Sequence, residues 1–159
     1  MHTHRFTYNG NTTAEKMIFQ MLNKISFCIS NLVPSKQMKA LILLGGYGKG
    51  EGGLVKENGT YLPHNNFDLL LVTSDLPETK RRNIYHLVTK KMQSLAQKLG
   101  VGIDISVIPE TKIKSMPTRV LWYDMKEGHR TISGDKHLIP SLPHFKKNIP
   151  SWDMRNLMV

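Results

Sequence analysis

Residues 41–53, LILLGGYGKGEGG, and residues 65–72, NNFDLLLV, decide how this sequence folds. Each contains an apolar run of strand length, and the first run leads into six glycines, at positions 45, 46, 48, 50, 52 and 53. Glycine allows positive φ and close backbone approach, and successive N–H groups in such a loop form a concave site for anions such as phosphate. The second run carries one carboxylate, Asp68. A phosphate-binding loop beside a strand-borne carboxylate is typical of metal-assisted phosphoryl or nucleotidyl transfer.

A later apolar run, residues 101–108, carries a second isolated acid, Asp104. An acid among apolar neighbours on a core strand is expected near an edge or a cleft, because an unpaired buried carboxylate is costly. Two such acids on neighbouring strands can share Mg²⁺, which binds one or two carboxylates together with phosphate oxygens and water. The alternative is that each acid only caps a turn or pairs with a lysine.

Length and composition indicate one domain with a substantial core, because the 159 residues are 40% hydrophobic and 21% charged. The net charge of +10 favours attraction to nucleic acid or to anionic small molecules such as NTPs, without choosing between them. A basic, solvated surface is the alternative, with the cationic run 80–82 on the solvent side of a helix. The single cysteine, Cys28, is expected to be a structural thiol.

No apolar run reaches the roughly 20 residues that span a bilayer. The first residues lack the apolar core of a signal peptide. We therefore expect a cytoplasmic location and no membrane partner.

Periodicity and turn signals predict alternating helices and strands. Helices are expected over 12–32, 75–99 and 117–125, the first beginning in a capping box at 12–15 and the second capped by Ser74 or Asp75. Strands are expected over 38–44, 66–72, 101–108 and 129–133, with a hairpin over 54–62 that turns at Asn58-Gly59. We expect a flexible lead-in over 1–11, a domain over 12–135 and a proline-rich tail over 136–159.

Taken in order, Leu44-Gly45-Gly46, Asn66-Phe67-Asp68 and Asp104 resemble the signature of the nucleotidyltransferase superfamily with the DNA polymerase β-like fold. That signature is an apolar residue, glycine and then glycine or serine, followed by an acid-x-acid strand and a third acid on a later strand. The gap between Gly46 and Asn66, residues 47–65, has 19 residues and is longer than is usual in the family. The nine residues of the predicted hairpin account for the extra length. The resemblance extends from residue 41 to about residue 135.

The resemblance implies an α/β (α+β) fold, in which helices pack on a small mixed β-sheet like that of the polymerase β palm. It also implies an NTP substrate and one or two Mg²⁺ ions held by Asp68 and Asp104, which with Asn66 would form the catalytic site. The implied nucleotide- and phosphate-binding residues are Gly45, Gly46, Tyr47, Gly48, Lys49 and Gly50. The glycine run further resembles a bacterial subgroup in which helices follow this domain, so the tail would lead to a helical partner domain or protein.

Asn66 stands where the family has the first acid of its acid-x-acid pair. Asparagine offers a neutral carbonyl oxygen instead of a charge, and losing that charge should cost at least roughly 10–100-fold in metal affinity or activity. Two functions therefore remain open. One is a Mg²⁺-dependent nucleotidyltransferase that transfers NMP from an NTP to a hydroxyl of a small molecule, an RNA or a protein. The other is a nucleotide-binding or regulatory module of the same fold, with weak catalysis or none.

Other nucleotide-binding readings fit poorly. Lys49 precedes Gly50 and an acid follows, which breaks the P-loop pattern. A dinucleotide site needs a helix directly after its glycines, whereas Leu54 begins the predicted hairpin. Among the seven histidines, His64 lies beside the expected site and could contact phosphate.

Overall fold

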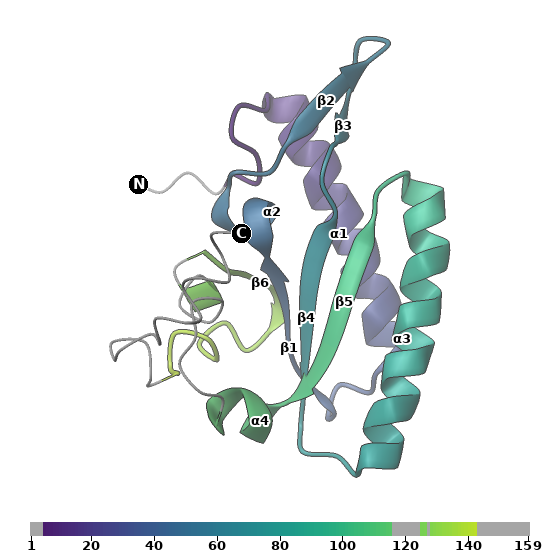
Figure 1. Cartoon of the computed structure of the whole chain (residues 1–159), viewed down its shortest axis with the longest axis vertical. Helices are drawn as coiled ribbons and strands as arrows, with labels where there is room; N and C mark the ends of the chain where they lie inside the picture. The colour runs from purple at the N-terminus through teal and green to yellow at the C-terminus, as the bar shows by residue number, and fades with distance from the viewer. Residues whose placement is uncertain (1–4, 116–124, 127, 143–159) are drawn as a thin grey trace, which may run out of the picture.

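The protein has a four-stranded mixed β-sheet with two long helices packed on one face (Figure 1). This computed structural model describes residues 5–115, 125–126 and 128–142. The strands are β1 (Met38–Leu44), β4 (Phe67–Thr73), β5 (Ile103–Pro109) and β6 (Arg130–Gly134), in the spatial order β5-β4-β1-β6. β4 and β5 are parallel, and the other two pairs are antiparallel. The expected small mixed sheet is confirmed.

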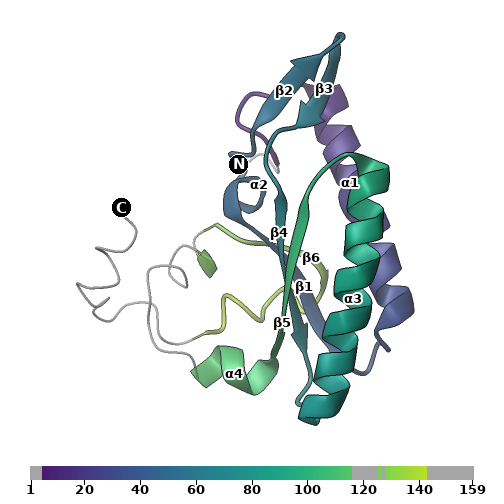
Figure 2. The ribbon, with the colours of Figure 1, turned by 45° about the vertical axis from the view of Figure 1, so that its right-hand side comes forward.

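The two long helices, α1 (Thr12–Leu32) and α3 (Glu78–Leu99), cover the same face of the sheet (Figure 2). The expected cap of α1 is wrong: Asn11 is the N-cap and accepts a hydrogen bond from the Ala14 N–H. α3 begins after Pro77 and ends at Gly100, which adopts the left-handed conformation. Asp75 does not cap α3; its carboxylate accepts hydrogen bonds from the N–H and hydroxyl of Thr111.

Alternation along the strands sorts the side chains onto two faces. Odd-numbered residues of β1 and β4 face the long helices, and even-numbered residues face the other side. The core on the helix side includes Ile18, Ile25, Leu41, Leu43, Tyr47, Phe67, Leu69, Leu71 and Val88. The core on the opposite side includes Ala40, Ile42, Leu70, Val72, Ile108, Ile113, Met125, Leu138, Ile139 and Leu142. Asp68 is even-numbered, like Leu70, so its side chain lies on the face of the sheet opposite the long helices.

Residues 5–10 pack on the domain, which the expectation of a flexible lead-in did not anticipate. Phe6 and Thr7 are buried, and their backbone N–H groups donate to the carboxylate of Glu15 on α1. Thr7 also forms an isolated β-bridge with Gly52. Glu15, read as part of a capping box, therefore ties the first residues to α1.

The remaining elements are a hairpin and two short helices. The hairpin, β2 (Leu54–Glu57) and β3 (Thr60–Pro63), is confirmed; Asn58 and Gly59 both have positive φ, and the hairpin projects beyond the end of the sheet (Figure 1). The short helices are α2 (Gly45–Lys49), which follows β1, and α4 (Glu110–Ser115), which the sequence analysis did not predict.

The expected helix over 117–125 lies almost wholly outside the described residues, as does the tail from residue 143. The part of the tail that is described is not a linker, because Leu138, Ile139 and Leu142 are buried in the core. Among the described helices, none combines the length and apolarity needed to cross a membrane.

Candidate functional site

The predicted glycine loop is largely a short helix. Gly45 begins α2 with φ of 63°, and a Cβ added there would collide with the Asp68 carboxylate. The N–H groups of Gly50, Glu51 and Gly52 donate to backbone carbonyls. These three amides therefore do not form the predicted anion-binding nest, although Gly46, in the first turn of α2, borders the acidic pocket described next.

Asp68 and Asp104 lie side by side as register partners on the parallel strands β4 and β5. Both are exposed, as expected for acids at the edge of a cleft. They line a pocket of about 480 Å³, here called the acidic pocket. Its lining residues are Gly46, Glu51, Gly52, Gly53, His64, Asn65, Asn66, Asp68 and Asp104. The sequence prediction that the two acids meet beside the glycine segment describes this arrangement.

Electrostatics in the acidic pocket favour a bound cation. Partial loss of hydration at the pocket wall, followed by repulsion from Asp104, raises the pKa of Asp68 above its ordinary value. Asn66 donates from Nδ2 to Oδ2 of Asp104 at 2.8 Å, which orients that carboxylate. Two adjacent carboxylates beside an amide form a donor set that suits Mg²⁺. No cluster of three or more His, Cys, Asp or Glu side chains suited to a metal occurs in the described part of the chain.

Tyr47, expected to bind nucleotide, is buried in the core and hydrogen-bonds to two residues that line the acidic pocket. Its ring is buried and meets Phe67 edge-on, with centroids 5.0 Å apart. Its hydroxyl donates to the Gly53 carbonyl at 2.7 Å and accepts from the Asn65 N–H at 3.4 Å. Burial raises the pKa of Tyr47, so the hydroxyl remains a donor at neutral pH. One buried side chain thus holds two segments of the pocket together.

Replacing Tyr47 with phenylalanine should therefore destabilise the fold by about 1 kcal/mol, because the Gly53 carbonyl loses its donor while the ring packing is kept. Urea denaturation measures this change. Tyr61→Phe, on the hairpin strand β3, is the matched control and should change stability by less than about 0.5 kcal/mol. Equal losses in the two variants would contradict the assigned role of the Tyr47 hydroxyl.

Three other predicted phosphate-binding residues lie away from the acids. Gly48, Lys49 and Gly50, at the end of α2, line a second pocket that shares no described lining residue with the acidic pocket. Gly48 is also buried against the backbone of Leu43. Sequence spacing could not separate these residues from Gly46, because within a single helical turn a shift of two positions reverses the direction in which a residue faces.

Several lining residues were not among the predicted site residues. Glu51, Gly52 and Gly53 follow α2, while His64 and Asn65 precede β4. Their proximity to the two apolar strands is the signal that could have found them, and on this signal His64 is expected to contact phosphate. The hairpin brings the two segments together, because Leu54 pairs with Pro63 and the His64 N–H donates to the Gly53 carbonyl. The Tyr47 hydroxyl adds a second link through Gly53 and Asn65.

Comparisons with solved structures place this fold. A spectinomycin adenyltransferase from Enterococcus faecialis, solved with ATP and spectinomycin, matches with a TM-score of 0.56 and 14% identity over 87% of this chain and 63% of its own. The toxin–antitoxin MntA–HpeT matches with a TM-score of 0.42 and 16% identity over 75% of this chain and 77% of its own. A candidate nucleotidyltransferase from Sulfolobus solfataricus matches with a TM-score of 0.45 and 16% identity, covering 76% of this chain and 94% of its own.

No family model matches the sequence, and no curated protein matches it. The structural likeness to the adenyltransferase establishes the fold: this chain has the mixed α/β architecture of nucleotidyltransferases. The chain spans less than two thirds of that enzyme's length.

Proposed function

We propose that this protein is a Mg²⁺-dependent nucleotidyltransferase, transferring NMP from an NTP to a hydroxyl group. The observation that carries the proposal is the pairing of Asp68 with Asp104 at the wall of a polar pocket bordered by Gly46. Carboxylates on adjacent strands, beside a backbone that a phosphate can approach, are the groups this reaction needs.

Each residue has a chemical task in the proposed reaction. Asp68 and Asp104 would hold Mg²⁺, which when bound neutralises phosphate charge and assists departure of pyrophosphate. Asn66 orients Asp104 through its amide hydrogen bond. Gly46, Gly52 and Gly53 line the pocket with backbone that a triphosphate would approach. The missing side chain of Gly52 leaves room for the Tyr47 ring.

The adenyltransferase fold supports this proposal, since that protein was solved with ATP and with an acceptor. For the present chain the acceptor stays open among a small molecule, an RNA and a protein. The cytoplasmic location and a helical partner domain or protein also stay proposals.

A second candidate function is a nucleotide-binding or regulatory module with little turnover. Asn66 favours it, because this neutral residue stands where the family signature has the first of its three acids. In this case the pocket would bind a nucleotide without transferring it.

Thermal unfolding with a panel of NTPs, with and without Mg²⁺, tests nucleotide binding. A nucleotide at 100 times its Kd stabilises a fold by about 2.7 kcal/mol, which is easily measured. We expect a Mg²⁺-dependent rise in Tm. A rise in Tm that is the same with and without Mg²⁺ would favour the binding module. The absence of any rise in Tm would overturn both functions.

Asn66→Asp should strengthen Mg²⁺-dependent transfer roughly 10–100-fold, because it places a carboxylate at the first acid position of the signature, beside Asp68 and Asp104. The same change should lower Tm without metal, because the new charge repels Asp104 instead of donating a hydrogen bond to it. Transfer of labelled NMP and thermal unfolding measure the two effects. Asn65→Asp places the same charge one residue away, on another lining position, and should gain less activity. Equal gains would show that charge alone, without position, is responsible.

A further inference from the structure

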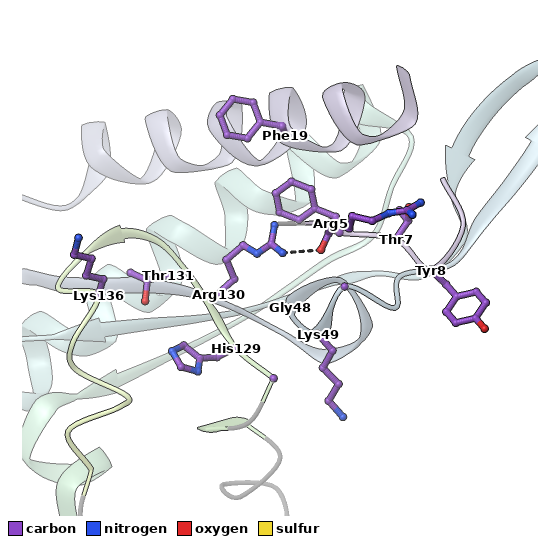
Figure 3. Close-up of a pocket in the computed structure, with 13 residues that line it drawn as sticks. Arg5, Thr7, Tyr8, Phe19, Gly48, Lys49, His129, Arg130, Thr131 and Lys136 are labelled. Carbon is purple, nitrogen blue, oxygen red and sulfur yellow. Dashed lines mark hydrogen bonds between the residues drawn. The ribbon is translucent and has the colours of Figure 1, made fainter. Parts of the chain in front are cut away.

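The second pocket, here called the basic pocket, has a volume of about 870 Å³ and is lined in part by Gly48 and Lys49 of α2 (Figure 3). Four of its lining residues are permanent cations from separate parts of the chain: Arg5, Lys49, Arg130 and Lys136. None of the described lining residues is acidic. A pocket lined by positive charges, with no acidic residue among its described lining, concentrates anions.

The cations are spread across the basic pocket. In Figure 3, Arg130 lies in the middle, with Lys49 and Lys136 on opposite sides of it. Arg130 is fixed there, because it donates to the Arg5 carbonyl at 2.6 Å and stacks over the Phe6 ring with its guanidinium 4.1 Å from the centroid. Such a spread suits several phosphates along a chain better than one phosphate, which needs converging donors.

Two aromatic side chains border the same pocket and are unusually exposed. Tyr8 is 79% exposed and Phe19 is 55% exposed. Burying their rings against another surface would be favourable, and the faces of unstacked bases are natural partners for exposed aromatic rings. A duplex keeps its bases stacked internally, so rings at the edge of a cationic hollow favour a single strand.

We propose that the basic pocket binds a single-stranded nucleic acid, with the cations contacting its phosphates and the two rings stacking on its bases. This site is independent of the proposed nucleotidyl transfer, because the two pockets share no described lining residue. The binding needs neither Mg²⁺ nor an NTP.

Fluorescence anisotropy with labelled oligouridylate and oligothymidylate of about 12 nucleotides tests the proposal over several salt concentrations. Four phosphate contacts should give a slope of about −3 in log Kobs against log salt. Lys49→Ala/Lys136→Ala should weaken binding roughly tenfold and make the slope shallower by about 1.4. Tyr8→Ala should weaken binding about fivefold or more, without changing the slope.

Lys90→Ala/Lys91→Ala is the matched control, because it removes two exposed charges from α3 and neither residue lines the basic pocket. This variant should bind the oligonucleotides nearly as the natural sequence does. Equal losses in the two double variants would overturn the proposal and indicate a general charge effect.

Two further outcomes would also overturn it. Displacement of the oligonucleotide by saturating ATP and Mg²⁺ would place the strand in the acidic pocket. Binding to phosphatidylserine vesicles but not to either oligonucleotide would indicate a lipid surface. Preference for one of the two oligonucleotides would support the proposal and show whether the 2′-hydroxyl contributes.

Discussion

Asp68→Asn should abolish most nucleotidyl transfer, by at least about 100-fold, while making the protein without metal more stable. The first effect follows because one of two paired carboxylates is lost from the acidic pocket. The second follows because the pKa of Asp68 is raised, so its ionised form is disfavoured in the fold. At neutral pH the charge of Asp68 opposes folding, and this cost disappears as the pH falls through the raised pKa. Transfer assays and Tm against pH measure the two effects.

Asp75→Asn is the matched control for Asp68, at the other end of β4. Hydrogen bonds from Thr111 lower the pKa of Asp75, so its charge favours the folded state. That contribution is present above the unfolded pKa and is lost as the pH falls through the lowered one. Asp75→Asn should therefore lower Tm near neutral pH and leave transfer unchanged. If both variants shifted Tm in the same direction, the assigned electrostatics of the acidic pocket would be wrong.

Gly45→Ala should cost about 1–2 kcal/mol of folding free energy and also impair the acidic pocket, because Gly45 has φ of 63°, a conformation that costs a side-chain-bearing residue about that much. The new methyl group would in addition collide with Oδ2 of Asp68, and this exposed carboxylate would have to turn away from it. Because the collision displaces a proposed metal ligand, the Mg²⁺ dependence of nucleotide binding should weaken as well.

Gly59→Ala separates backbone strain from the collision. Gly59 has φ of 80°, and a Cβ there would meet no atom within 4 Å. This variant should also lose about 1–2 kcal/mol, from backbone strain alone, and should bind nucleotide normally. Urea denaturation and NTP-dependent Tm compare the two. If Gly45→Ala impaired nucleotide binding no more than Gly59→Ala, the close approach of α2 to Asp68 would not matter.

Strong local signals predicted most of the secondary structure. β1 was expected at its observed bounds, because seven mostly apolar residues between Pro34 and a glycine run leave little choice. The Asn58-Gly59 turn and the end of α3 at Gly100 were predicted because each needs positive φ, which these residues adopt readily. The cap of α1 and the burial of Phe6 were missed, because both depend on which distant groups compete for the same hydrogen bonds.

The sequence by itself determined the strands and the long helices, and it placed Asp68 and Asp104 on two of those strands, because alternation and periodicity act within a few residues of each position. The register of β4 on β5, which sets the two acids side by side, is a tertiary contact. Only the tertiary structure decided which residues of the glycine-rich segment 45–53 face Asp68 and Asp104. The single turn of α2 points Gly46 toward the acidic pocket and Lys49 toward the basic pocket. Tyr47, between them in sequence, is buried. The physical reason is that the direction a residue faces in α2 depends on packing against Phe67, Gly53 and the first residues of the chain, which no local pattern records.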